Sequence, residues 1–118
     1  NPEAGSYGPT IITEHELQLP NSVGSRDFSP AQKFWVLHGH LSTESLDMVE
    51  VGESFTVGQI IATIGHENEN GGWPPHIHIQ LSLSQPEQND LPGVVRLSDR
   101  DAALRLYPDP RLIVGPVY

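Results

Sequence analysis

The stretch of sequence that decides the fold runs Trp73-Pro74-Pro75-His76-Ile77-His78-Ile79-Gln80-Leu81. Polar and apolar residues alternate from His76 onward, and a period of two is typical of a β-strand with one buried face. Because proline lacks the backbone N–H that a sheet needs, the strand is predicted to begin at His76. One face would carry His76, His78 and Gln80, and the core-facing side would carry Ile77, Ile79 and Leu81.

Two histidines on one strand face can do chemistry together. The strand rise places the two imidazoles about 7 Å apart, so one can hold a metal while the other reaches a substrate. For an isolated His-x-His, a solvated strand face is the simpler alternative. A second pair, His38-Gly39-His40, ends another apolar run at residues 34–41, which also has strand propensity. Imidazole suits both zinc ligation and proton transfer near neutral pH, although polar residues are also ordinary where a strand meets a loop.

Length and composition indicate one domain with a real core. The chain has 118 residues, of which 36% are hydrophobic and 18% charged, so it is neither disordered nor membrane-embedded. Its net charge of −9 argues against a nucleic acid partner, since phosphate contacts need a basic surface. No signal peptide and no apolar run of the roughly 20 residues that span a bilayer are found, so no membrane insertion is expected. The compartment stays unassigned.

The remaining strands and turns predict an all-β fold. Residues 10–15 and 34–41 are predicted strands that form an antiparallel hairpin around the polar loop 17–30. In residues 51–65, glycines at 52, 58 and 65 are expected to separate further short strands. Together these features predict an antiparallel β barrel-sandwich, with residues 1–95 as the β domain.

The C-terminal part differs in character. Residues 98–107 are predicted to form one short helix, with Ser98 as its N-cap and Pro108 as its stop. Residues 108–116 read as an extended tail, so residues 96–118 are assigned to a helix and linker. Ser42 to Ser45 are expected to cap a short turn.

Four motifs in order resemble the lysostaphin-type (LytM-like) zinc endopeptidases, which cut peptide crosslinks in bacterial cell walls. The resemblance covers about residues 7 to 83 and implies a peptidase-like β core, a peptide substrate and a zinc cofactor. The matching motifs are Tyr7-Gly8 before a strand ending Glu14-His15, His38-Gly39-His40-Leu41-Ser42, Gly52 to Gly58-Gln59, and Pro75-His76-Ile77-His78-Ile79.

The resemblance also implies roles for three histidines. His78 would ligate zinc, while His76 and His40 would lie beside the metal-bound water as bases or oxyanion stabilisers. His38 stands where the family often has tyrosine and receives no role. The three site histidines are therefore expected to converge on one open face, with His15 structural and the polar loop around His66 bordering the cleft.

One departure from the family pattern concerns the metal. The family takes two further zinc ligands from an upstream His-x-x-x-Asp, and no histidine here is followed by aspartate at that spacing. Cysteine is absent, so thiolates cannot replace them. Either the first strands of the domain precede Asn1, or the domain is a degenerate, non-catalytic relative. Zinc binding is expected only with the upstream ligands.

The C-terminal segment resembles a junction in fused proteins. Residues 91–95 and 106–112 are similar to the sequence between such a peptidase-like domain and a class III, pyridoxal-phosphate-dependent aminotransferase. The alternative function is therefore a non-catalytic module that binds peptide or neighbouring domains of the same polypeptide. A biotinyl or lipoyl carrier is a third reading, but the sole lysine, Lys33, lacks the context of a carrier lysine.

Overall fold

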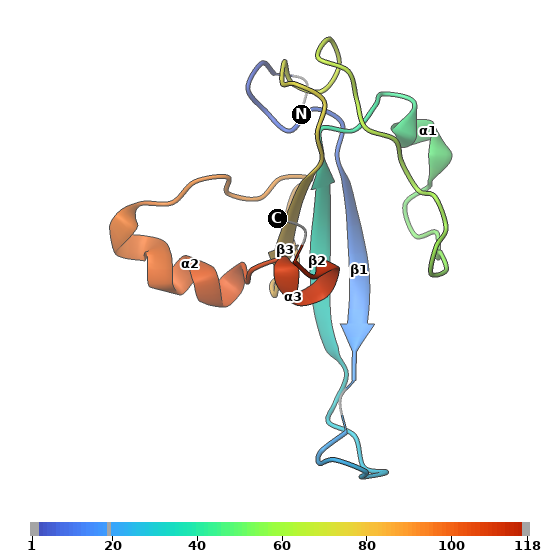
Figure 1. Ribbon diagram of the computed structural model, residues 1–118, viewed down its shortest axis with the longest axis vertical. Coiled ribbons are helices and arrows are strands. Elements are labelled where there is room, and N and C mark those ends of the chain that lie inside the picture. The colour runs from blue at the N-terminus through green and yellow to red at the C-terminus, as the bar shows by residue number, and fades with distance from the viewer. Residues whose placement is uncertain (1–2, 19, 117–118) are drawn as a thin grey trace.

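The fold is built on a three-stranded antiparallel sheet (Figure 1). The computed structural model describes residues 3–18 and 20–116. The strands are β1 (Ile11–Leu17), β2 (Gln32–Gly39) and β3 (His78–Ser82), in the spatial order β1-β2-β3. The helical segments are α1 (Ser45–Met48), the 3-10 turn η1 (Leu97–Asp99), α2 (Arg100–Leu106) and α3 (Arg111–Val114). The prediction of a mainly-β, antiparallel fold is confirmed at this level.

The hairpin predicted from the first two strands is present. Ile11 pairs with His38 at one end of the β1–β2 ladder, and Leu17 pairs with Gln32 at the other. The apolar run of β2 supplies the centre of the core, where Val36 and Leu37 are buried between the two neighbouring strands. The other buried apolar side chains are Leu41, Leu81 and Leu91.

The strand that carries the His-x-His pair begins later than predicted. β3 starts at His78, which pairs with Gly39, the last residue of β2. His40 then has a φ of 61°, which turns the chain out of the sheet, so His76 has no strand partner beside it. The prediction that Ile77 faces the core is wrong, because 44% of this side chain is exposed. Leu81 does lie in the core, as predicted.

The prediction of short strands in residues 51–65 is also wrong. This segment makes turns and extended stretches, and its pairing is a single bridge between Ile64 and Leu41. Gly52 and Gly58 do occupy positive φ, so the turns were predicted where they occur. The stretches between the turns found no neighbouring strand, and Val57 and Ile60 remain exposed.

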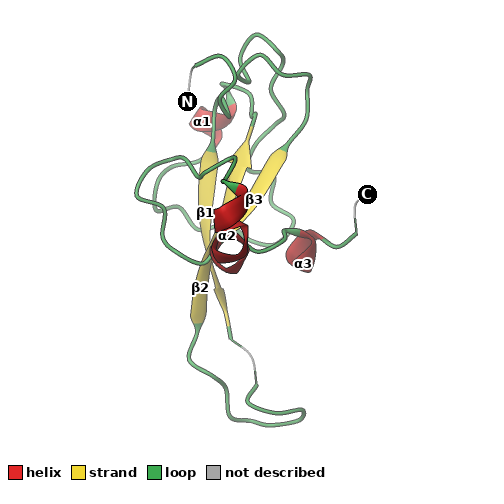
Figure 2. Ribbon diagram, turned by 90° about the vertical axis from the view of Figure 1, so that its left-hand side faces the viewer, coloured by secondary structure: helices red, strands yellow, loops and turns green. Residues whose placement is uncertain are grey.

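More than one helix follows the sheet. The segment predicted as one helix over 98–107 divides into η1 and α2, and Ser98 makes no side-chain cap. The predicted extended tail contains α3, where the Asp109 carboxylate accepts a hydrogen bond from the backbone N–H of Arg111 at 2.9 Å. This bond satisfies a donor at the start of the helix and favours helical turns there. Both helices lie on the β3 side of the sheet (Figure 2).

The short turn expected after residue 41 is present as α1. The N-cap residue of α1, Glu44, makes no side-chain cap. The Ser42 hydroxyl accepts a hydrogen bond from the backbone N–H of Ser45 at 3.3 Å, which holds the turn that leads into α1. Among the residues that the structure describes, no helix has the length and apolar character needed to cross a membrane.

Candidate histidine site

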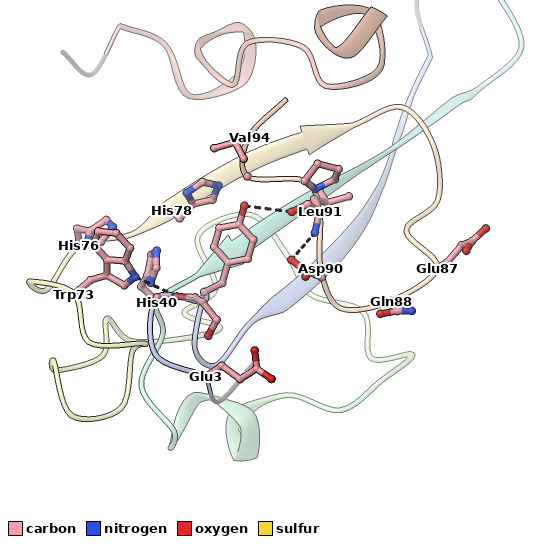
Figure 3. Close-up of a pocket in the computed structure, with 15 residues that line it drawn as sticks. Glu3, His40, Trp73, His76, His78, Glu87, Gln88, Asp90, Leu91 and Val94 are labelled. Carbon is pink, nitrogen blue, oxygen red and sulfur yellow. Dashed lines mark hydrogen bonds between the residues drawn. The ribbon is translucent and has the colours of Figure 1, made fainter. Parts of the chain in front are cut away.

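Three histidines predicted from the sequence lie together at one end of the sheet. The His40 ring centroid is 4.3 Å from that of His76 and 6.0 Å from that of His78. His40 directly follows β2, and His78 begins β3 opposite Gly39, so strand pairing itself creates this proximity. Figure 3 shows the three rings on one wall of a pocket. The expected convergence of these side chains is therefore observed.

The pocket is a broad cavity of about 1070 Å³. Tyr7 and Trp73 add aromatic surface beside the histidines, and the segment 87–94 forms the opposite side. Its lining includes three carboxylates, Glu3, Glu87 and Asp90, and no lysine or arginine. A cavity of this size and lining can take an extended peptide segment.

Backbone carbonyls fix the ring orientation of two of these histidines. Nδ1 of His40 is 2.8 Å from the carbonyl oxygen of Asn70, and Nδ1 of His76 is 2.6 Å from that of Pro74. A carbonyl only accepts, so each Nδ1 carries the proton, and each Nε2 has a free lone pair in the neutral ring. Two imidazoles are thereby prepared to accept protons from a ligand in the pocket.

His78 has the opposite arrangement. Its Nε2 is 3.3 Å from Oε1 of Gln80, while Nε2 of Gln80 donates to the carbonyl of Pro92 at 3.1 Å. With the amide oriented in this way, Nε2 of His78 donates and Nδ1 keeps a lone pair that can ligate a metal. Burial lowers the pKa of His78, and the charged forms of His40 and His76 would lower it further. The hydrogen bond with Gln80 opposes this effect in part. His78 is therefore favoured as a neutral imidazole.

Asn70 is a structural residue of the site that the sequence interpretation missed. Its side chain is fully buried and donates to the carbonyls of Gly65 and Trp73, at 3.1 and 2.8 Å. Its Oδ1 accepts from the backbone N–H of Trp73 at 2.9 Å. These bonds hold the loop in the shape that brings the backbone carbonyl of Asn70 to His40. The signal in the sequence is an asparagine directly before Gly71-Gly72, a pair with positive φ.

Tyr7 is the second residue whose position the sequence interpretation did not anticipate. Its ring centroid lies 4.6 Å from that of His78, and its hydroxyl donates to the carbonyl of Leu91 at 3.3 Å. A Cβ at Gly39 would approach Cβ of Tyr7 to 3.2 Å. The glycine between His38 and His40 therefore makes room for this ring.

The other histidines lie away from the pocket. Nδ1 of His38 donates to the carbonyl of Ile11 at 3.2 Å, so this ring supports the hairpin, and burial lowers its pKa. His15 stacks on Phe34 with ring centroids 5.1 Å apart, which fits its predicted structural role. His66 is exposed and does not line the cavity, so the expectation that it borders the cleft is wrong.

The described side chains do not by themselves form a zinc site. Within residues 3–18 and 20–116, no group of three or more His, Cys, Asp or Glu side chains is placed to hold a metal ion. A catalytic zinc takes three protein ligands, and no carboxylate joins the histidines at bonding distance. His78 offers Nδ1, and Nε2 of His40 and His76 is also free, but the three rings are not placed to share one ion.

The fold and the pocket together define a small, mainly-β domain with three clustered histidines beside a broad cavity. No protein-family model, no curated protein and no solved structure matches this chain. A function must therefore be argued from the pocket itself.

Proposed function

We propose that this chain is a lysostaphin-type zinc endopeptidase-like domain of a larger protein, with the β barrel-sandwich architecture of that family. In this proposal His78 is a zinc ligand, and His40 and His76 exchange protons with a bound peptide or with water. The larger protein would also contain a class III aminotransferase domain after residue 118.

The observation that carries the proposal is the convergence of His40, His76 and His78 with complementary free nitrogens. Nδ1 of His78 is free for a ligand bond. His40 and His76 each donate the Nδ1 proton to a backbone carbonyl, so their Nε2 atoms are free. A scattered set of surface histidines would not share one cavity wall with this pattern of tautomers. Each ring is suited to one role, ligation or proton transfer.

The ligands that His78 lacks must come from elsewhere, since the described residues do not supply them. We propose that a further segment of the larger protein, carrying His-x-x-x-Asp, provides two more. No chemical step through zinc is assigned to the 118 residues alone. Their own contribution is to bind the peptide, to orient it against Tyr7 and Trp73, and to hold protons at His40 and His76.

The test uses a longer chain in which a segment bearing His-x-x-x-Asp precedes Asn1. This chain should bind one zinc ion and hydrolyse a peptide. His78→Ala should lose the metal, whereas His76→Ala should keep it and lose turnover. The matched control is His66→Ala, which removes an exposed imidazole outside the cavity and should change neither. Failure of the longer chain to bind zinc would refute the proposal.

A second candidate function is a non-catalytic module that binds peptide. The specific observation in its favour is the incomplete ligand set beside a cavity of about 1070 Å³ that is already large enough for a ligand. It predicts that the 118-residue chain binds peptide without metal and that the zinc-loaded longer chain does not cleave it. Peptide titration with and without zinc separates the two functions.

A further inference from the structure

The outer edge of β1 is open in the part of the chain that the structure describes. β1 pairs with β2 on one side, and no third strand pairs with it on the other. Alternate residues of an edge strand direct their N–H and C=O groups outward, where they can pair with another chain. At the opposite edge, the backbone N–H of Leu83 donates to Leu106 at the end of α2, so the helix approaches the sheet there.

The usual protection of an edge strand is weak at β1. Natural edges are blocked by prolines, bulges or charges that point along the edge. β1 contains no proline, and its two acids, Glu14 and Glu16, lie over the sheet face toward Lys33 of β2, at 2.8 and 4.0 Å. Neither acid therefore blocks the backbone edge of β1.

A groove follows this open edge. It has a volume of about 740 Å³ and is bounded by residues 10–15 on one side and by residues 46–55 with Ile61 on the other. Figure 1 shows the segment after α1 descending beside β1. No backbone hydrogen bond joins residues 11–17 to residues 46–61 within the described chain. The two walls meet at one ring contact, between His15 and Phe55, whose centroids are 6.2 Å apart. Its β1 wall carries the backbone donors and acceptors that an extended strand would use.

The chemistry of the walls selects the occupant. Ile12, Leu46 and Phe55 provide apolar surface, and Leu46 is 49% exposed to solvent. Glu50 and Glu53 provide the charge, since the Glu14 carboxylate is paired with Lys33, and no lysine or arginine lines the groove. A second copy of this chain would place these acids and the acids of its own β1 against each other, and like charges across a strand pair are destabilising.

We propose that the β1 edge binds an extended segment of another polypeptide in which apolar residues alternate with lysine or arginine, adding a fourth antiparallel or parallel strand. Backbone hydrogen bonds to β1 give affinity, as in other cases of strand addition. Apolar side chains of the segment cover Ile12 and Phe55, and its basic side chains meet Glu50 and Glu53. This inference is independent of the histidine pocket and of the function proposed for it.

The probe is a synthetic seven-residue peptide of alternating valine and lysine, capped at both ends, which matches the length of β1. NMR titration of the 118-residue chain should shift the amide signals of residues 11–17 and slow their hydrogen exchange. A peptide with glutamate in place of lysine should not bind. A peptide with two central prolines should also fail, because proline cannot donate to the ladder. Full binding by the proline peptide would overturn strand addition.

A pair of charge variants locates the site. Glu50→Lys changes a residue that lines the groove, and Asp47→Lys makes the same charge change on α1, outside it. Glu50→Lys should weaken peptide binding by about fivefold, the size expected for one exposed ion pair, and Asp47→Lys by much less. Equal loss in both variants, signal changes spread over the acidic surface, or self-association without peptide would each refute the proposal.

Discussion

The backbone carbonyl of Asn70 accepts the Nδ1 proton of His40 at 2.8 Å, across 30 residues of sequence. Both residues are buried, and Asn70 is fully so. The side chain of Asn70 meanwhile closes the loop from Gly65 to Trp73 with three hydrogen bonds. One asparagine thus sets both the shape of the loop and the tautomer of a site histidine.

Asn70→Ala should therefore be strongly destabilising. It removes a buried amide with three partners, and each buried hydrogen bond is worth about 1 kcal/mol, with a larger cost for partners left unpaired. We expect a loss of about 2–4 kcal/mol in the free energy of unfolding, measured with urea. The control Asn68→Ala alters an exposed residue of the same loop and should change stability by less than about 0.5 kcal/mol. Equal effects of the two variants would contradict this account.

A milder substitution at Asn70 should also alter the tautomer of His40. Nitrogen NMR should report Nδ1–H as the dominant neutral tautomer of His40 in the unaltered chain, because the partner oxygen can only accept. In a variant such as Asn70→Ser, which retains a small polar side chain, the loop loosens and the two tautomers should become more equal. If His40 is an Nε2–H tautomer in the unaltered chain, the assignment of its free nitrogen is wrong.

Two glycines near the site should differ in how they tolerate a methyl group. At Gly39 the new Cβ meets the Tyr7 side chain at 3.2 Å, and a ring can shift by a few tenths of an ångström. At Gly65 it meets the backbone oxygen of Leu41, which cannot move without breaking the bridge to Ile64. Gly39→Ala should cost about 1–2 kcal/mol, and Gly65→Ala more than about 3 kcal/mol. Thermal unfolding of both variants checks this order, and the reverse order would contradict it.

The stability of the chain should fall as the pH falls below neutral. Burial lowers the pKa of His38, and the Ile11 hydrogen bond only partly offsets this. The unfolded state, with an ordinary pKa near 6.5, therefore binds the proton first, so the unfolded state gains protons that the folded state does not. The contribution of neutral His38 to the free energy of unfolding is fully present above the pKa of the unfolded state. It is lost as the pH falls through the lower pKa of the folded state.

Urea unfolding between about pH 8 and pH 5 measures this loss. His38→Gln keeps a side chain that can donate to the Ile11 carbonyl but cannot be protonated, so the slope of stability against pH should flatten. His66→Gln changes an exposed histidine and should leave the slope as it is. A slope that is unchanged in His38→Gln would assign the pH dependence to other groups, of which His15 and His78 also have lowered pKa values.

The features that could be predicted from the sequence are those with a local signal. Alternation and β-branched residues predicted the β1–β2 hairpin. The two His-x-His pairs, together with the family resemblance, predicted that His40, His76 and His78 would meet, whereas His38 of the first pair lies away from the pocket. The start of β3 could not be predicted from alternation, because it depends on where β2 ends. That end is set by the positive φ of His40 and by its backbone N–H, which donates to the carbonyl of Tyr7 at 2.6 Å.

The features that were missed depend on partners distant in sequence. Residues 51–65 have the glycines of strand-connecting turns, but a strand exists only where a neighbour accepts its hydrogen bonds, and Ile64 alone finds one, at Leu41. Tyr7 belongs to a motif of the family resemblance and Asn70 precedes a Gly-Gly pair, but neither signal says which site residue the side chain would contact. Their roles follow from contacts with His78 and His40 that only the folded chain brings about.

The 118-residue chain should bind zinc weakly and should not hydrolyse peptides without further ligands. In the proposed function His78 is the one zinc ligand within the described residues, and a single imidazole does not hold zinc against water, whereas three protein ligands do. His40 and His76 also keep a lone pair on Nε2, but within the described residues the three rings are not placed to share one ion. Calorimetric titration with zinc near neutral pH measures this directly, and His78→Ala should remove whatever weak binding is present. Stoichiometric, submicromolar binding by the unaltered chain would mean that the rings rearrange into a three-histidine site, and His40→Ala and His76→Ala would then each abolish it.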